Sequence, residues 1–509
     1  MWMEECINDL FDYGVNGTNL ALIYEANKTN KVAVMTPNGV TERTKVEKIV
    51  MQGEVFGPLE CSVSVDTFGK ECLAKRKHLY SYKGVDVPPL AMIDDLAWIT
   101  NCGVETVKAN GYINAKTNLK KLQFGPEKCH KIHVGKKKPY CPELSIDSWK
   151  LKLKNGVKTK NEEISDIFDG EAEMEESHEE KYLGDIVTND GTNKKNIAAR
   201  KGRGIGIIEK IIEMLQEITF GNSYFEVANL LRHSLFLSSI LLNSEAWYNV
   251  SQTDIEQLEK VDQSLIRRIL EAPCSTPTAS LYLEMGCLPI RFIIKTRRIM
   301  YLHYILNQDE NSLLFKFFLA QKNDPVKGDW TEQVQSDMKD IDLKLTMNEI
   351  KTLSQESFRN TVKKAVEKAA FTWLLSEKAK KSKLKDLEYR KLECQNYLRS
   401  TELETREKKF LFQIRTRMIE VKANFKNNHS DILCPLGCED EDDQNHLLHC
   451  KKLIQNNNDI TTGNIEYSDI FHEDISRQVR ILRIINNLWK IRRNIMIKGG
   501  TLLMCPNVI

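Results

Sequence analysis

The spacing of apolar residues divides the chain into two parts. In the first 200 residues, short apolar runs alternate with turn-forming residues, and the runs "ALIYEA" and "KVAVMT" on either side of "NKTN" predict a β-hairpin. The segment "WKLKLK" at 149–154 alternates with a period of two and predicts a strand. From about residue 205, as in "GIIEKIIEMLQEI" and "TDIEQLEKVDQSLIRRIL", apolar residues recur every three or four positions and predict amphipathic helices. The pattern therefore predicts an α+β fold whose later part is mainly α-helical.

Two interruptions of this pattern indicate how the chain is organised. Residues 161–180 contain ten acidic residues and no Lys or Arg, which predicts an exposed loop. Residues 322–348 contain Asp-Pro and Gly-Asp pairs, which predict a loop between helical blocks. Because 509 residues exceed what a single core usually contains, we expect several domains. The predicted segments are 1–204, which includes the acidic loop, 205–321, 322–425 and 426–509.

The overall composition is that of a globular protein, with 41% hydrophobic and 28% charged residues. No apolar run approaches the roughly 18 residues that a membrane-spanning helix needs. The acidic residues Glu4, Glu5 and Asp9 do not fit the basic start of a secretory signal. Thirteen scattered cysteines, an odd number, argue against a disulfide framework. We therefore expect an intracellular protein without a membrane partner.

A cysteine-rich motif, "CPLGCEDEDDQNHLLHC", occupies residues 434–450. Three residues separate Cys434 from Cys438, and His446 and Cys450 are four positions apart, which places them on one face of a helix. Four such ligands suit tetrahedral Zn²⁺ at about 2.0 to 2.3 Å. The alternatives are His449 in place of His446, or four unligated core residues. The acidic residues in between favour the zinc site, because such a loop is too polar for an apolar core.

The last helical segment, "SRQVRILRIINNLWKIRRNIMIK", is both basic and amphipathic. Its basic residues are Arg480, Arg483, Lys490, Arg492 and Arg493. Such a helix either contacts the phosphates of a nucleic acid or packs on the cysteine-rich motif with a solvated outer face. The sequence leaves both interpretations open.

Two adjacent carboxylates, Asp94 and Asp95, lie between two apolar runs in "LAMIDDLAWI" at 90–99. Asp is common in turns, so the simplest interpretation is the tip of a β-hairpin. Such a tip can also present carboxylate oxygens to hard divalent cations such as Mg²⁺. The pair alone does not decide between the two interpretations, so the motifs around it carry the argument.

Three further motifs flank this pair. "VMQGEVFGPL" at 50–59 places glycines and a proline before a predicted helix, "LQFGPEKCHKIHVGK" at 122–136 joins a Gly-Pro break to a strand, and "KYLGDIV" at 181–187 predicts a strand and turn. This succession resembles the reverse transcriptase domain of non-long-terminal-repeat retrotransposons. The resemblance assigns template and nucleotide contacts to Gln52, Gly53, Pro58 and Lys128, catalysis and metal binding to Asp94 and Asp95, and a primer grip to Tyr182, Leu183 and Gly184.

The resemblance also implies an architecture. Residues 1–204 would form an incomplete polymerase palm, which is an antiparallel sheet with helices, and residues 205–321 a helical thumb. Residues 322–425 would form a helical connector, and residues 426–509 a small zinc knuckle followed by the basic helix. A similar knuckle in this family is associated with nucleic-acid binding.

The activity implied by the resemblance is RNA-directed DNA polymerisation. Two Mg²⁺ or Mn²⁺ ions about 3.5 to 4 Å apart activate the primer hydroxyl and neutralise the leaving pyrophosphate in such a reaction. The implied partners are an RNA template, a DNA primer and deoxynucleotides, and the implied location is the nucleus or the cytoplasm.

The sequence departs from the family pattern in two places. Met92 and Ile93 stand where the family usually has an aromatic residue and Ala. The family's other catalytic aspartate lies upstream of the Gln-Gly motif, whereas this chain opens on "MWMEECINDLFDYG", a predicted helix. We therefore expect a truncated reverse transcriptase with weak or no nucleotidyl transfer. The alternative is a noncatalytic RNA- or DNA-binding protein that acts through the zinc knuckle and the basic helices.

Overall fold

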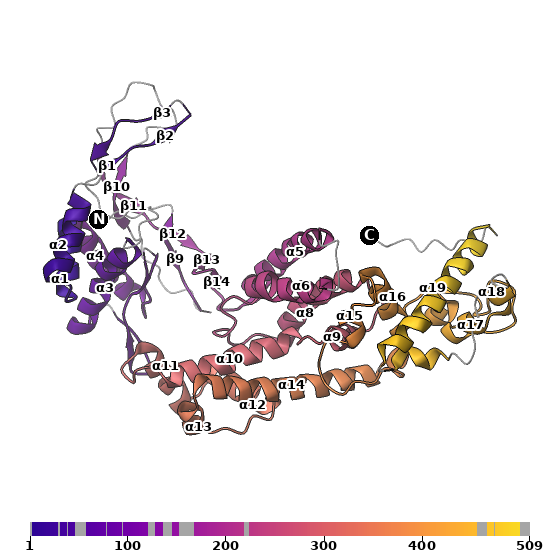
Figure 1. Ribbon diagram of the computed structural model, residues 1–509. Helices are drawn as coiled ribbons and strands as arrows, with labels where there is room; N and C mark the ends of the chain where they lie inside the picture. The colour runs from indigo at the N-terminus through magenta and orange to yellow at the C-terminus, as the bar shows by residue number, and fades with distance from the viewer. Residues whose placement is uncertain are drawn as a thin grey trace. The chain divides into compact units, whose positions relative to one another are not determined.

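The computed structural model forms two compact units, one of residues 1–195 and 308–326 and the other of residues 196–307 and 327–509. Figure 1 traces the elements of each unit along the chain. Among the described helices, none has both the length and the apolar character needed to cross a membrane. The structure describes residues 3–28, 31–37, 39–45, 57–77, 79–93, 95–120, 128–135, 145–151, 167–217, 223–455, 466–472 and 474–498.

The first unit combines helices with short strands. Its helices are α1 (Met3–Asp12), α2 (Gly17–Lys28), α3 (Gly57–Lys75), α4 (Gly103–Lys120) and α11 (Leu313–Asn323). Its strands are β1 (Lys31–Val32), β2 (Met35–Thr36), β3 (Gly39–Val40), β4 (Thr44–Lys45), β5 (Tyr80–Tyr82), β6 (Val85–Val87), β7 (Leu90–Met92), β8 (Asp95–Ala97), β9 (His130–Ile132), β10 (Ser145–Leu151), β11 (Ile167–Glu173), β12 (Glu175–Ser177), β13 (Glu179–Tyr182) and β14 (Asp185–Thr188).

Turn residues fix the register of the tight hairpins in this unit. In β13–β14, Tyr182 pairs with Asp185, and the two residues between them, Leu183 and Gly184, have φ values of +47° and +87°. Two consecutive residues with positive φ give a turn whose twist matches that of the flanking strands. The hairpin predicted from "KYLGDIV" is therefore present, and its turn is set by local sequence.

The α+β fold class is confirmed, but the strands do not join into one antiparallel sheet within the described residues. They form seven two-stranded sheets, of which the β9–β12 pair is parallel and the others are antiparallel. The run "ALIYEA" lies in α2, so the hairpin predicted across "NKTN" is wrong. Leu20 and Ile23, three positions apart, pack on a core of Cys6, Leu10 and Val63, which favours the helical spacing.

The loop predicted for the acidic segment is also wrong from residue 167 onward. This segment contains β11, which pairs antiparallel with β10 along its whole length, and then β12 and β13. Residues 149–151 of the strand predicted at 149–154 lie in β10, and residues 152–154 lie outside the described residues. Acidic composition indicates that the side chains favour solvent. Strand formation depends on hydrogen bonds to a neighbouring strand, which composition does not reveal.

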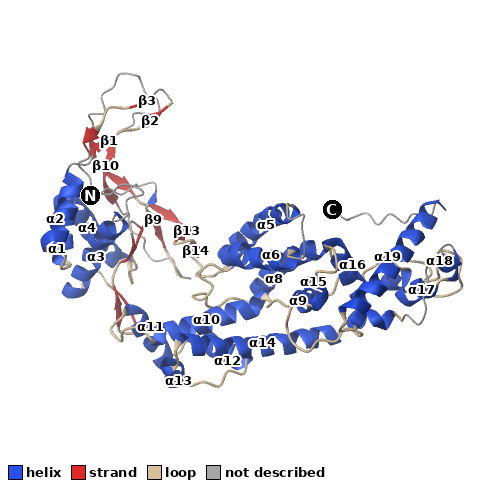
Figure 2. Ribbon diagram, viewed as in Figure 1, coloured by secondary structure: helices blue, strands red, loops and turns tan. Residues whose placement is uncertain are grey.

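The second unit is helical in its described part, as Figure 2 shows. Its elements are α5 (Lys194–Gln216), α6 (Tyr224–Leu231), the π-helix η2 (Arg232–Leu237), α7 (Ser238–Ile240), α8 (Gln252–Leu270), α9 (Thr278–Met285), α10 (Ile290–Leu306), α12 (Trp330–Asp340), α13 (Met347–Thr352), α14 (Gln355–Ala379), η3 (Ser382–Leu384), α15 (Asn396–Arg399), α16 (Thr405–Arg415), η4 (Lys422–Asn428), α17 (Gln444–His449), α18 (Lys451–Gln455), η5 (Tyr467–Phe471) and α19 (Ile475–Lys498).

Helix α12 lies inside the segment 322–348 that was predicted to be a loop. The Asp329 side chain accepts a hydrogen bond from the backbone N–H of Glu332 and so caps the start of this helix. Trp330, Val334 and Met338, spaced by four residues, form its buried stripe. The Gly-Asp pair therefore begins a helix instead of extending a loop.

The two long helices predicted from periodicity are confirmed as α5 and α8. Each buries its apolar stripe, for example Ile208 and Ile211 in α5 and Leu258 and Leu265 in α8. One core continues from these helices through α9 and α16 to α17 and α19. The cysteine-rich motif therefore contributes residues to the main core of this unit. The finer division of the chain into four segments stays a prediction.

Candidate metal centre

The cysteine-rich motif brings Cys434, Cys438, His446 and Cys450 together. One ligand atom from each residue lies within 4.8 Å of the others, and the Sγ atoms of Cys438 and Cys450 are 3.6 Å apart. Ligands on a tetrahedral zinc ion with bonds of about 2.3 Å lie about 3.8 Å from one another. Within the described residues, this is the only group of three or more His, Cys, Asp or Glu side chains that could hold a metal ion.

Local sequence shapes the loop that carries the first two cysteines. The Gly437 N–H donates to the Cys434 carbonyl at 3.1 Å, and Gly437 has a φ of +84°, in the region that favours glycine. The Cys434 N–H donates to the Asp440 carbonyl at 3.0 Å, which folds the loop back on itself. Asp443 then caps α17 by accepting from the His446 N–H at 2.6 Å. Turn and cap together place the four ligands.

Burial controls the protonation of these thiols. It raises the pKa of Cys434, and it raises the pKa of Cys450 from 9.0 to about 12. Backbone hydrogen bonds from Leu436 and Cys438 to Cys434 act against burial and lower its pKa, and one from Leu453 does the same for Cys450. Both residues are therefore neutral thiols at neutral pH without a metal, while their N–H partners are in place to stabilise thiolates.

His446 is placed as a ligand, whereas His449 is exposed. The Nε2 atom of His446 is buried and has no hydrogen-bond partner. Its Nδ1 atom lies 3.6 Å from the carboxylate of Asp440. A ligating imidazole commonly directs its second nitrogen to a carboxylate, which fixes the tautomer and the ring orientation. A buried, unsatisfied nitrogen beside three thiols is what a zinc ligand presents before the metal binds, so the four residues fit Zn²⁺.

An ion pair joins the cysteine-rich motif to the last helix, α19. Asp442 is completely buried, and its two carboxylate oxygens accept from the guanidinium of Arg492 at 2.5 and 2.6 Å. The same carboxylate accepts from the Lys422 N–H at 2.8 Å. Arg492 is one of the five basic residues noted in this helix, and its side chain is turned inward, where it neutralises Asp442.

The remaining basic residues of α19 stay at the surface. Arg480, Arg483, Lys490 and Arg493 are exposed and form no ion pair with any described residue. The opposite face of α19, including Ile481, packs against the core near α17, α18 and η5. The helix therefore docks on the motif and also presents a basic outer face, which we call the α19 basic face.

The predicted catalytic pair is only partly covered by the structure. Asp94 lies outside the described residues, and Asp95 is exposed at the start of β8, where it pairs with Met92. Burial raises the pKa of Tyr182, and the charge of Asp95 adds to this rise, so the two side chains lie close enough to interact. Ile93, next to Asp94, has a φ of +59°, which is unusual for a β-branched residue.

The other residues assigned through the resemblance are scattered. Gln52 and Gly53 lie outside the described residues. Pro58 is the exposed second residue of α3, and Lys128 is exposed just before β9. Leu183 and Gly184 form the turn of β13–β14, and Tyr182, just before this turn, is the member of the predicted primer grip whose pKa the charge of Asp95 raises. The roles of all these residues stay predictions.

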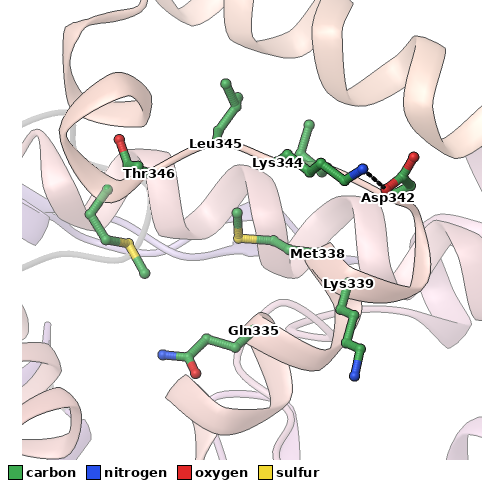
Figure 3. Close-up of a pocket in the computed structure, with 9 residues that line it drawn as sticks. Gln335, Met338, Lys339, Asp342, Lys344, Leu345 and Thr346 are labelled. Carbon is green, nitrogen blue, oxygen red and sulfur yellow. Dashed lines mark ion pairs between the residues drawn. The ribbon is translucent and has the colours of Figure 1, made fainter.

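The second unit also has a surface hollow of about 420 Å³, shown in Figure 3. Its lining includes Met338 from α12 and Leu345 and Thr346 from the segment that leads to α13. Asp342, the one carboxylate in this lining, is paired with Lys344 at 3.1 Å. No Cys or His is among the residues that line it, so the hollow offers no chemical group that points to a reaction.

Asp440, Asp442 and Arg492 were not recognised from the sequence as supports of the metal centre. Asp440 and Asp442 lie in a run of acidic residues whose composition predicts that all of them are solvated. Arg492 lies in a basic helix. The apolar periodicity of α19 could have indicated that Arg492 is buried, because it places Arg492 one position after Ile491, at the edge of the buried stripe.

No known protein-family model matches this chain, and no curated protein matches it. The resemblance to reverse transcriptases therefore depends on the motifs in the sequence alone.

Proposed function

We propose that this chain is a nucleic-acid-binding protein of the reverse transcriptase kind, whose second unit binds RNA or DNA through a zinc-ordered C-terminal region. One observation carries the proposal: a Cys₃His cluster fitted for zinc is joined by the buried Asp442–Arg492 pair to a helix with an unpaired basic outer face. Unpaired cations on a rigid helix suit phosphates, because neutralising them releases condensed counterions.

Zinc has a structural role in this proposal. Four protein ligands leave no open coordination position, which is typical of structural and not of catalytic zinc. When bound, the ion would cross-link the 434–438 loop to α17 and stabilise the packing of α17 on α19. Cys434, Cys438, His446 and Cys450 would hold it, and Asp440 would orient His446.

Filter binding of a single-stranded RNA over a range of salt concentrations tests this function. The triple variant Arg480→Gln, Arg483→Gln and Lys490→Gln should weaken binding at all sequences alike. For single strands, the slope of log affinity against log salt changes by about 0.7 for each phosphate contact, so three lost contacts should reduce its magnitude by about 2. Removal of zinc with a chelator should also weaken binding, because it loosens the support of α19.

The matched control is Lys364→Gln with Lys368→Gln on α14, two exposed residues without an ion pair in the described structure. This control should keep the slope of the unaltered protein. If the triple variant also keeps that slope, the α19 basic face does not bind nucleic acid and the proposal fails.

A second candidate function is RNA-directed DNA polymerisation at Asp94 and Asp95. The interaction between Asp95 and Tyr182 favours it, since it brings the predicted catalytic hairpin near the predicted primer grip. In this hypothesis, two Mg²⁺ or Mn²⁺ ions bind the pair, and an RNA template, a DNA primer and deoxynucleotides are the substrates.

Primer extension with Mg²⁺ or Mn²⁺ tests the second candidate. Any extension should fall to background in Asp94→Asn and Asp95→Asn, because the amide cannot replace the carboxylate charge on the metal. The control is Asp86→Asn on β6, a carboxylate outside the predicted catalytic pair. Extension that survives both substitutions would exclude this hairpin as the catalytic site.

A further inference from the structure

A second strongly basic segment spans the end of α14 and the residues that follow it. Residues 376–385, "SEKAKKSKLK", contain five lysines and one glutamate. The glutamate, Glu377, is paired with Lys380 at 2.6 Å. Lys378, Lys381 and Lys385 form no ion pair with any described residue. The segment therefore gathers positive charge that the described part of the protein does not neutralise.

The fifth lysine, Lys383, is held in an unusual position. Its Nζ atom lies 4.6 Å from the centroid of the Phe425 ring, in cation–π contact. Partial burial lowers the pKa of Lys383, and no carboxylate contributes to this shift. An aromatic ring compensates an ammonium group less well than a carboxylate does, so Lys383 remains able to accept an anionic partner.

Contacts with the metal centre fix the position of Phe425. The η4 segment that contains it is anchored to Asp442: the Lys422 N–H donates to the Asp442 carboxylate at 2.8 Å, and the Ala423 N–H donates to the Asp442 carbonyl at 3.0 Å. Lys426, the residue after Phe425, pairs with Glu441 at 3.0 Å. The lysine segment thus reaches, through Phe425, the same loop that would hold zinc.

We propose that Lys378, Lys381, Lys383 and Lys385 form a second surface for the phosphate backbone of a single-stranded nucleic acid, which Phe425 positions beside the metal centre. The inference rests on the proposed nucleic-acid binding of the second unit and adds a separate place of contact. Several cations within eight residues match a repeating phosphate chain, because successive phosphates present charge at short, regular intervals. An acidic protein surface is the other partner with this charge, and the test separates the two.

The experiment compares variants of the full chain with a labelled oligouridylate of about 20 nucleotides as the probe. Lys381→Gln with Lys385→Gln should lower the magnitude of the salt slope by about 1.4, which corresponds to two lost phosphate contacts. The control Lys364→Gln with Lys368→Gln removes the same charge from α14 itself, about 20 Å along the chain direction, and should keep the original slope. All four side chains are exposed, so thermal melting should be unchanged.

The role of Phe425 is tested separately. Phe425→Leu removes the aromatic face that holds Lys383 and should weaken RNA binding, whereas Phe425→Tyr keeps that face and should restore it. A packing defect alone would lower the melting temperature in the leucine variant without changing the salt slope.

The outcomes distinguish the two proposals. If the α19 triple variant lowers the slope and Lys381→Gln with Lys385→Gln does not, the second surface is refuted while the proposed function stands. If the Lys381 and Lys385 substitutions lower the slope and the α19 substitutions do not, the second surface stands and the α19 basic face is refuted as the nucleic-acid contact. A slope that is unchanged in both, or retention of an acidic protein with no affinity for the oligouridylate, overturns the second surface.

Discussion

Zinc binding to the Cys₃His cluster should release protons and strengthen as the pH rises. Cys434 and Cys450 are protonated at neutral pH, since burial raises the pKa of both and that of Cys450 reaches about 12. Zinc binds thiolates, so each of these two residues gives up a proton on binding. The affinity should therefore rise at least about 100-fold per pH unit, or about 2.7 kcal/mol, because each of the two protons contributes about 1.36 kcal/mol per unit.

Titration of the metal-free protein with zinc in a weakly buffered solution at pH 7 measures the protons released. We expect at least two per zinc ion. Cys450→Ser should release one fewer and bind zinc more weakly, while Cys274→Ser, a change at an exposed cysteine outside the cluster, should match the unaltered protein. Release of fewer than two protons, or an affinity that is flat between about pH 7 and 8, would refute zinc coordination by these protonated thiols.

The same pKa values give opposite pH dependences with and without metal. In the metal-free protein the pKa of Cys450 is above its ordinary value of 9.0, so folding favours the neutral thiol. Its contribution to stability is complete below about pH 9 and is lost as the pH rises toward 12. With zinc bound the thiolate is the ligand, and this loss disappears. Thermal melts at neutral and alkaline pH, with and without zinc, measure the difference.

Three substitutions test the structural argument, each by chemical denaturation against the unaltered protein. Arg492→Leu leaves the buried Asp442 carboxylate without its partner and should cost about 3 to 5 kcal/mol; a cost below 1 kcal/mol would show that Asp442 is solvated. Gly286→Ala should cost about 2 to 5 kcal/mol, because its φ is +63° and an added Cβ would meet the backbone of Glu393 and Cys394; an unchanged midpoint would contradict that close approach. Ile93→Gly should stabilise the β7–β8 hairpin by about 1 kcal/mol by relieving a positive φ, and a loss of stability would mean that the strain is absent.

Local signals in the sequence were sufficient for several elements. Helical periodicity identified α5 and α8, and the Leu-Gly pair at 183–184 gave the β13–β14 hairpin. These features depend on interactions between residues a few positions apart, which the order of residues displays directly. The spacing of Cys434, Cys438, His446 and Cys450 likewise indicated a four-ligand metal site, because a short loop and one helical turn suffice to bring the ligands together.

Composition misled where the outcome depended on partners distant in the chain. The acidic segment became strands because β10 supplies backbone hydrogen-bond partners, and its charge count held no information on that pairing. The Gly-Asp pair at 328–329 predicted a loop, whereas in the structure the apolar stripe of α12 is buried and a helix begins there. In both segments a nonlocal contact decided between two locally acceptable conformations.

The sequence by itself determined the helical character of α5, α8 and α19, the cysteine-rich motif and the basic character of the last helix. Only the tertiary structure decided that His446 and not His449 faces the thiols, and that Arg492 points inward to Asp442 while Arg480, Arg483, Lys490 and Arg493 point outward. Only the tertiary structure also placed Lys383 on Phe425, 42 residues away in the chain. The physical reason is that a charged side chain is oriented by the free energy of desolvation and pairing, and its partner is found in space and not along the sequence.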